Sequence, residues 1–202
     1  MPSREASGAA ADLGERIGAR IRSLRADRGY SLEVLGARSG VSRSAISLIE
    51  RNASSPTAVV LERIATALDV PLASLFDDAT APPCPVARRR DQATWRDPLS
   101  GYLRRNLSPA QWPTALRLVE VTFPPGAVVS YETSVRNVPI DQQVWVLSGR
   151  IDVTVDATTH SLSGGDCLAM RLDAPVSFAN PTSRPSRYVV AIVAGAVLHQ
   201  AP

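Results

Sequence analysis

The chain has 202 residues, a formal net charge of +3, 45% hydrophobic residues and 16 prolines. Its apolar fraction excludes a disordered chain, and no apolar run reaches the roughly 18 residues of a membrane-spanning helix. The length fits one large domain or two small ones. We therefore predict a soluble globular protein without a membrane partner.

The N-terminus and the cysteines are typical of a reducing, cytoplasmic protein. Residues 1–11 contain no apolar signal core, so we predict a cytoplasmic location. Cys84 and Cys167 lie far apart, with no CxxC or Cys/His spacing. This spacing argues against a disulfide framework and against a zinc finger.

Residues 12–78 place apolar side chains three and four positions apart, which is typical of amphipathic helices. Turn-forming residues divide this stretch at 28–30, 39–41, 52–56 and 69–71. The pattern predicts four short helices and a fifth over Pro71–Phe76. The expected N-caps are Ser31, Ser42 and Thr57.

The composition changes after residue 78. Residues 79–92 combine prolines, which oppose a helix, with arginines, which oppose a core, so we predict an exposed linker. Residues 93–198 contain short apolar or alternating runs separated by Pro, Gly and Ser. The clearest runs are Leu116–Phe123, Gln143–Leu147, Ile151–Val155 and Tyr188–Val193. Many short strands at regular spacing predict an all-β sandwich or barrel.

Residues 31–51 have the order of a helix-turn-helix motif. Gly40 can adopt the backbone angles of a tight turn, and Ala37 is small enough for two helices to cross closely. The apolar residues expected to hold the second helix against the first are Val41, Ile46 and Ile49. The residues left facing outward are Ser42, Arg43, Ser44 and Ser47.

Residues 12–78 resemble the xenobiotic-response-element (Xre) family of repressor domains, which are related to the lambdoid phage repressors. The stretches that carry the resemblance are Ser31–Leu35, Ser39–Ser44, Leu48–Arg51, Ser55–Thr57 and Ala67–Phe76. The resemblance implies a five-helix lambda-repressor-like domain whose second motif helix enters the major groove of double-stranded DNA.

The resemblance also implies which side chains touch DNA. Base contacts are expected from Arg43 and Ser44, with Ser47 or Leu48 as further candidates. Arg43 is the strongest candidate because a guanidinium bonds bidentately to guanine, which discriminates by about 1–3 kcal/mol. The expected phosphate contacts come from Ser31, Ser42, Arg22 and Arg51. The other interpretation of this surface is a solvated helix face in a protein–protein module.

Two further features bear on DNA binding. Many relatives carry Gln where this chain has Leu32 and Leu48, so specificity is expected to depend more on Arg43. Residues 1–78 contain ten Arg and ten acidic residues, so attraction to DNA has to come from a local patch. One such module reads only a half-site, so we predict a homodimer, paired through its C-terminal half, on a two-fold symmetric operator.

Residues 110–195 resemble the cupin family. The stretches that carry this resemblance are Pro125–Gly126, Gln142–Val153 and Leu162–Leu168. It implies a double-stranded β-helix barrel whose interior holds one ligand. A helix-turn-helix domain followed by such a barrel is a familiar bacterial regulator architecture, and Trp95–Tyr102 resembles its lead-in segment.

Enzymatic cupins share two His, a Glu and a third His that hold a metal ion. By spacing, these four positions carry Glu132, Ser134, Gln142 and Val176. Serine and a primary amide are weak donors and valine is none, so we predict no metal, no other cofactor and no catalytic residue. His160 and His199 are expected in a hairpin turn and in the C-terminal tail. A metal-dependent cupin enzyme that carries a DNA-binding domain is the alternative.

Strand alternation predicts which side chains face the barrel interior. The candidate ligand-binding residues are Glu132, Gln142, Val144, Val176, Phe178 and Asn180. A few polar groups in a mainly apolar cavity suit a small organic effector with a hydrogen-bond donor or a cationic group. Alternatively, side chains fill the barrel and leave only a dimerisation module. Trp145 fits either the cavity mouth or a dimer interface.

Overall fold

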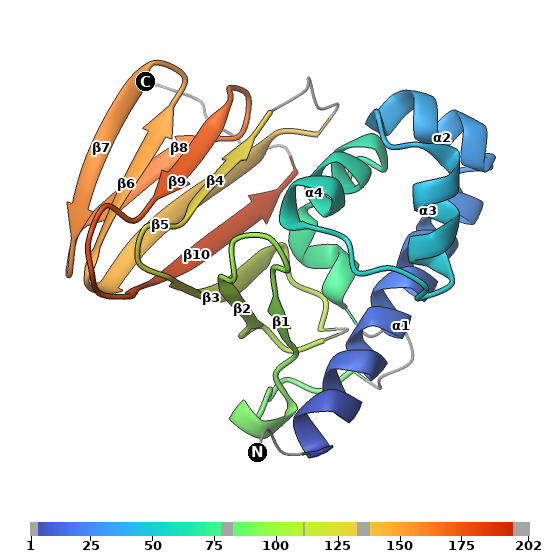
Figure 1. Cartoon of the computed structure of the whole chain (residues 1–202), viewed down its shortest axis with the longest axis horizontal. Helices are drawn as coiled ribbons and strands as arrows, with labels where there is room; N and C mark the ends of the chain where they lie inside the picture. The colour runs from blue at the N-terminus through green and yellow to red at the C-terminus, as the bar shows by residue number, and fades with distance from the viewer. Residues whose placement is uncertain (1–3, 78–82, 111, 133–137, 196–202) are drawn as a thin grey trace.

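A computed structural model describes residues 4–77, 83–110, 112–132 and 138–195, with side chains from residue 13 onward. Helices occupy one side of the molecule and two β-sheets the other (Figure 1). In this part of the chain, no helix combines the length and the apolar character that crossing a bilayer requires.

Four α-helices form the N-terminal domain within the described residues. They are α1 (Arg4–Asp27), α2 (Leu32–Ser39), α3 (Arg43–Glu50) and α4 (Ala58–Ala67). The segment expected as a fifth helix is instead a 3₁₀ helix, η1 (Leu72–Phe76). Pro71 before it lacks a capping side chain, and the extended backbone of Asp77 ends it after five residues. The segment is therefore too short to build an α-helical hydrogen-bond ladder.

The helix boundaries follow from local chemistry. The hydroxyls of Ser31, Ser42 and Thr57 accept backbone N–H groups three residues later, which confirms the expected N-caps. Gly40 ends α2 with a positive φ of 66°. Ala37, expected at a close helix crossing, is exposed. The close approach is at Gly36, where an added Cβ would lie 3.0 Å from the Val41 carbonyl oxygen in the turn before α3.

The C-terminal domain is a sandwich of two antiparallel sheets. Its ten strands are β1 (Thr94–Arg96), β2 (Leu103–Asn106), β3 (Leu116–Phe123), β4 (Val128–Tyr131), β5 (Ile140–Ser148), β6 (Arg150–Val155), β7 (Thr158–Ser163), β8 (Cys167–Arg171), β9 (Val176–Ala179) and β10 (Ser186–Ala194). One sheet has the order β1-β2-β3-β10-β5-β8 and the other β4-β9-β6-β7. The sheets share no strand pair within the described residues, so the expected closed barrel is a sandwich here.

Two expectations for individual residues change with the sheet register. The β6–β7 hairpin turns at residues 156–157, so His160 lies inside β7 opposite Val153 and not in the turn. His199 lies outside the described residues. His160 is half-buried on an edge strand, so strand alternation, and not the geometry of the turn, decides which face of the sheet its side chain occupies.

The core between the sheets contains a chain of aromatic rings. Neighbouring centroids lie 5.7–6.3 Å apart. In order of contact the rings are Phe76, Trp95, Tyr102, Phe123, Tyr188, Phe178 and Tyr131. Because Phe76 belongs to η1, this chain of rings runs from the helical domain into the sandwich.

A buried carboxylate also joins the two domains. Asp97, in the turn between β1 and β2, is 2% exposed. Its Oδ1 accepts the backbone N–H of Ala58 at the start of α4, at 2.8 Å. Its Oδ2 accepts the N–H and hydroxyl of Ser100. The lead-in segment Trp95–Tyr102 thus attaches the N-terminus of α4 to the sandwich.

Candidate functional site

The second motif helix, α3, has one buried and one exposed face. Ile46 and Ile49 are buried in the helical core. On the opposite side, Arg43, Ser44 and Leu48 are exposed, and Ser47 between them is half-buried. The α3 surface therefore presents one cation, one hydroxyl and one apolar side chain together, the groups that read base edges and thymine methyls.

The two N-cap serines lie at the start of α2 and of α3. Their hydroxyl oxygens accept N–H groups from Val34 and Ala45, each at 3.2 Å. The Ser31 hydroxyl also forms a hydrogen bond with the Glu33 carboxylate, and the Ser42 hydroxyl oxygen lies 3.3 Å from that of Ser44. Both serines are exposed, so each hydroxyl can exchange that contact for a phosphate oxygen without giving up its cap.

Arg43 has an ion-pair partner on α2. Its Nη1 lies 3.0 Å from Oε1 of Glu33, and the two side chains are 68% and 61% exposed. A pair this exposed holds its partners weakly, so Arg43 is available to a base. The Glu33 backbone N–H, the Ser31 hydroxyl and the charge of Arg43 hold the pKa of the Glu33 carboxyl below its usual range. Glu33 is therefore ionised at neutral pH.

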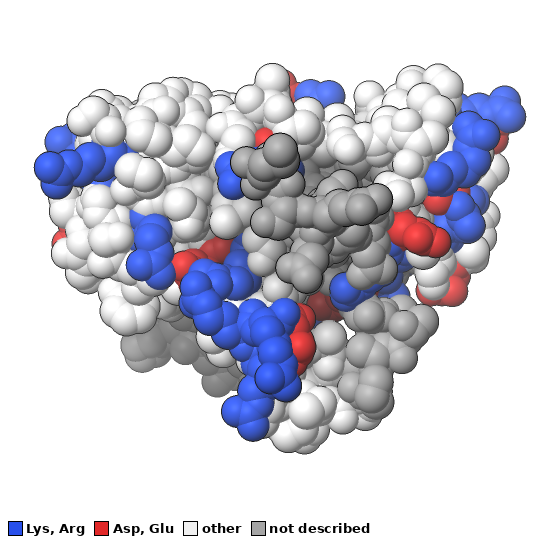
Figure 2. Space-filling view, turned by 60° about the horizontal axis from the view of Figure 1, so that its bottom comes forward, with Lys and Arg blue, Asp and Glu red and all other residues white. Residues whose placement is uncertain are grey.

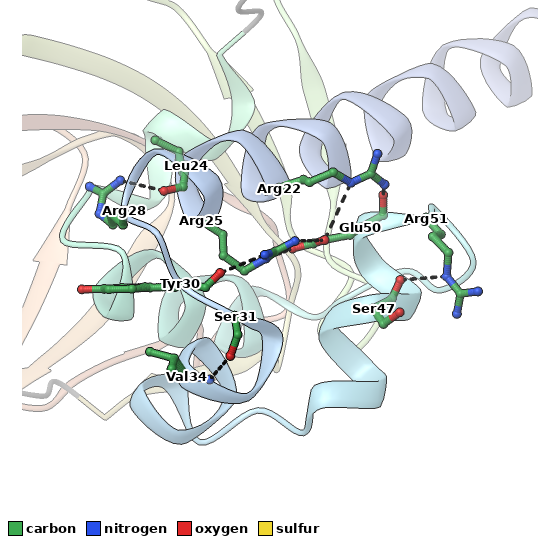
Figure 3. A network of polar contacts seen from close by, with 10 residues as sticks. All are labelled: Arg22, Leu24, Arg25, Arg28, Tyr30, Ser31, Val34, Ser47, Glu50 and Arg51. Atoms are coloured by element: carbon green, nitrogen blue, oxygen red, sulfur yellow. Dashed lines mark hydrogen bonds and ion pairs between the residues drawn. The ribbon is translucent and has the colours of Figure 1, made fainter.

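A buried ion pair holds α3 against α1 (Figure 3). Nε and Nη2 of Arg25 lie 2.7 and 2.9 Å from the two carboxylate oxygens of Glu50, which is 7% exposed. Nη1 of Arg25 also donates to the Tyr30 carbonyl at 2.9 Å. The hydrogen bonds to Glu50 raise the pKa of Arg25. This bidentate pair orients the whole reading helix, and sequence spacing did not reveal it.

The two arginines expected at phosphates differ in their freedom. Arg22 donates to the Glu50 carbonyl, and its Nε lies 3.7 Å from the Glu50 carboxylate. Arg51 is exposed, and its contact with the described residues is one hydrogen bond from Nε to the Ser47 carbonyl, at 3.1 Å. Arg51 is thus the freer phosphate donor. In Figure 2 the basic side chains over the helical domain are interspersed with acidic ones, so the positive surface is local.

A second candidate site is a cavity of about 80 Å³, here called the central cavity. One water needs roughly 10–15 Å³, so the central cavity has room for a small organic group. Gln142, Val176 and Phe178 line it, as expected from strand alternation. Glu62 of α4 and Leu72 of η1 also line it. The wall of the central cavity therefore includes both domains.

Three expected ligand residues lie elsewhere. Glu132 is 82% exposed and its carboxylate pairs with Arg63 of α4 at 2.8 Å. Val144 is fully buried in the packed core. Asn180 donates to the carbonyls of Phe123 and Arg184, so it closes a loop. None of the three lines the central cavity, which corrects the sequence-based assignment.

The structure adds polar groups to the central cavity that the sequence analysis missed. Arg104 of β2 and three tyrosines, Tyr102, Tyr131 and Tyr188, contribute to its wall. Burial raises the pKa of Tyr102, and it raises the pKa of Tyr131 and of Tyr188 well above the usual value. All three are therefore neutral phenols at neutral pH. For Tyr188 the sequence did contain a signal, because alternation along the strand places it on the same face as Val190 and Ile192.

The four positions that hold a metal in enzymatic cupins do not fit one here. Val176 has no donor atom, Glu132 faces Arg63, and Ser134 lies outside the described residues. Among the described residues of this set, Gln142 and Val176 line the central cavity, and the Gln142 amide is a weak metal donor. Within the described residues, no group of three or more His, Cys, Asp and Glu side chains could hold a metal ion.

Comparison with known proteins agrees with the motif geometry. The family model HTH_3, a helix-turn-helix, matches residues 21–75. The match runs from the second half of α1 to η1 and includes the whole helix-turn-helix motif. The transcriptional regulator SutR of Escherichia coli is 26% identical over 84% of the chain and 89% of its own length. PuuR of the same organism is 26% identical over 89% of the chain and 96% of its length.

A solved structure extends the similarity to both domains. The crystal structure of an HTH_3 family transcriptional regulator from Vibrio cholerae superposes with a TM-score of 0.72 at 22% identity. It covers 91% of the chain and 97% of that protein, so the two share their fold. The chain thus joins a helix-turn-helix domain to a C-terminal two-sheet domain, and it shares this two-domain fold with that transcriptional regulator.

Proposed function

We propose that this protein is a sequence-specific transcriptional regulator that binds a two-fold symmetric operator as a homodimer and senses a small organic effector. The observation that carries the proposal is the exposed face of α3, with Arg43, Ser44 and Leu48 directed away from a buried anchor. The regulators SutR and PuuR are similar over most of the chain. The central cavity, with walls from both domains, supports the effector role.

Arg43→Ala tests the reading helix. We expect operator affinity to fall by about 1–3 kcal/mol, because the base bonded to the guanidinium loses its partner. The base preference at one position of each half-site should relax as well. The operator is first selected from a pool of random duplexes, and both quantities are then measured by fluorescence anisotropy.

Two variants control for general electrostatics. Glu33→Gln removes the ion-pair partner of Arg43 and one negative charge from the same face, so DNA affinity should hold or increase. Arg51→Ala should weaken binding evenly across sequences and lower the salt dependence by about one phosphate contact. An Arg43→Ala protein with unchanged affinity and base preference would contradict the proposed reading role.

The outer face of the six-stranded sheet supports the homodimer. Trp145 and Leu147 of β5 are 52% and 37% exposed there. Val189 of β10 pairs directly with Trp145, and Val193 pairs with Leu116 of β3, which is 42% exposed. These apolar residues share the outer face of β3, β10 and β5, where Glu120 lies opposite Val189 and Asp141 lies opposite Val193. A second copy is the occupant that a two-fold symmetric operator requires.

Trp145→Arg tests this pairing. A charge in place of this large exposed apolar side chain should convert the dimer to a monomer, measured by sedimentation velocity. Because the Trp145 side chain is half exposed, the substitution should leave the fold unaffected. Affinity for a two-site operator should fall at least tenfold, while binding to a single half-site stays the same. Leu99→Arg is the control, because Leu99 is 79% exposed and lies in the β1–β2 turn, away from this face. A dimeric Trp145→Arg protein would assign dimerisation to another surface.

A further inference from the structure

We propose that the central cavity binds a small monocarboxylate, with Arg104 as its counter-ion. This inference rests on the proposed effector role of the cupin-like domain and names the chemical class of the effector. It reverses the charge expected from the sequence, because the acidic Glu132 lies outside the central cavity and Arg104 lies within its wall.

Arg104 is a buried cation with donors left over. The residue is 6% exposed, and its Nε and Nη2 atoms are buried without a hydrogen-bond acceptor. A guanidinium stays protonated in proteins, so the charge cannot be removed by deprotonation. The Phe76 ring lies 5.1 Å from Cζ and stabilises the face of the guanidinium, but it supplies no oxygen acceptor in the guanidinium plane. A bound carboxylate would supply two such oxygens.

The neighbouring polar groups also favour an acceptor-rich ligand. The Tyr102 and Tyr131 hydroxyl oxygens lie 3.3 Å apart, and Tyr188 and the Gln142 amide contribute to the same wall. Burial keeps these phenols protonated, so they donate hydrogen bonds and add no negative charge. A cation in this cavity would face Arg104 directly, which is unfavourable at low effective dielectric constant.

The rest of the wall sets the size and the valence of the anion. Most of the other lining side chains are aliphatic or aromatic, such as Phe123 and Phe178, so the body of the ligand is apolar. A volume of about 80 Å³ limits it to a short chain. Glu62 is the carboxylate among the lining residues, on the side of the helical domain. Among the described lining residues Arg104 is the one cation, so a second carboxylate would lack a counter-ion, which favours a monocarboxylate over a dicarboxylate.

The same ligand would contact both domains. Glu62 belongs to α4 and Leu72 to η1, while Arg104 lies on β2 beside the aromatic contact between Phe76 and Trp95. Filling the central cavity would therefore change how firmly the helical domain is held against the sandwich. By linkage, DNA and the carboxylate would alter each other's affinity by the same factor.

Calorimetric titration of the full chain with butyrate is the direct test. Butyramide and butylamine are the neutral and cationic controls, and succinate is the dicarboxylate control. We expect butyrate to bind and to raise the melting temperature through binding linkage, with the three controls at least tenfold weaker. Butyrate binding that is matched by butyramide, or the absence of binding by any monocarboxylate from acetate to hexanoate, would overturn the proposal.

Arg104→Gln separates ligand binding from a structural role. The variant keeps a hydrogen-bonding side chain but loses the charge, so butyrate affinity should fall at least tenfold. The melting temperature without ligand should change little, because the variant removes both a buried cation with two unsatisfied donors and its attraction to Asp77. Arg105→Gln, on the same strand but facing Glu120 on the outer side, should bind butyrate like the wild type. A lower melting temperature with unchanged butyrate affinity would make Arg104 structural.

Operator binding, measured in the same preparations, reports on the proposed function separately. A protein that binds its operator but no monocarboxylate retains the regulator role and loses this inference. Tight binding of butylamine with no binding of butyrate would overturn the carboxylate proposal and indicate a site for a cationic effector. A protein that binds butyrate but selects no DNA sequence would retain the anion site and overturn the proposed function.

Discussion

Replacing Glu50 with alanine should lower the free energy of unfolding of the helical domain by about 3 kcal/mol, because it leaves the Arg25 guanidinium without its bidentate partner. Glu50 is 7% exposed and the Arg25 side chain 17%, so water cannot fully replace the lost carboxylate. Urea denaturation followed by far-ultraviolet circular dichroism measures the change.

The double variant Arg25→Met/Glu50→Leu distinguishes pairing from packing. Removing both charges together should recover most of the stability, since buried ion pairs often exchange for apolar side chains at little cost. Glu50→Ala should also weaken operator binding, because α3 loses the contact that orients it against α1. If Glu50→Ala unfolds at the same urea concentration as the wild type, the buried pair does not stabilise the domain.

Gly18→Ala should be the most damaging of the conservative changes in α1. An added Cβ would lie 2.5 Å from the Ile49 carbonyl oxygen and 3.1 Å from that of Glu50, and both are backbone atoms at the end of α3. Alanine favours a helix by about 1 kcal/mol over glycine, but overpacking costs about 1–3 kcal/mol. We therefore expect a net loss of unfolding free energy and weaker operator binding, because the end of α3 has to move.

Gly14→Ala is the matched control, one helical turn earlier. Its added Cβ would lie 2.4 Å from Oδ1 of Asn52, which is a side-chain atom and not a backbone atom. Stability should therefore hold or increase by up to about 1 kcal/mol, with operator binding unchanged. Equal losses in Gly14→Ala and Gly18→Ala would show that general helix substitution, and not the contact with α3, causes the effect. Both quantities come from urea denaturation and fluorescence anisotropy.

The helical half could be predicted almost completely because its signals are local. Apolar residues at three- and four-residue spacing, a serine or threonine before three of the helices and Gly40 after α2 each act within one or two turns. One exception was Pro71–Phe76, whose apolar pattern does not distinguish a short α-helix from a 3₁₀ helix. Another was α1, expected as a short helix from residue 12 onward, which begins at Arg4 and has 24 residues. In the other half, the strand Leu116–Phe123 was predicted with its observed bounds.

The central cavity could be predicted only in part. Alternation along β5 and β9 predicted that Gln142, Val176 and Phe178 face inward, and all three line the cavity, while their role in ligand binding stays a prediction. Glu132 follows the end of β4, where alternation no longer applies, and its carboxylate turns to Arg63. Counting residues along the cupin pattern cannot show that the chain turns after β4 and carries Glu132 out of the cavity.

What the sequence by itself determined is therefore the set of elements and the exposed face of the reading helix. Only the tertiary structure decided that Arg104 faces inward and Arg105 outward, since two adjacent arginines in a four-residue strand read the same in either orientation. It also decided that Arg25 meets Glu50 and that Glu62 reaches the central cavity. Periodicity is a property of one element, whereas pairing and burial of charge depend on which elements meet across the fold.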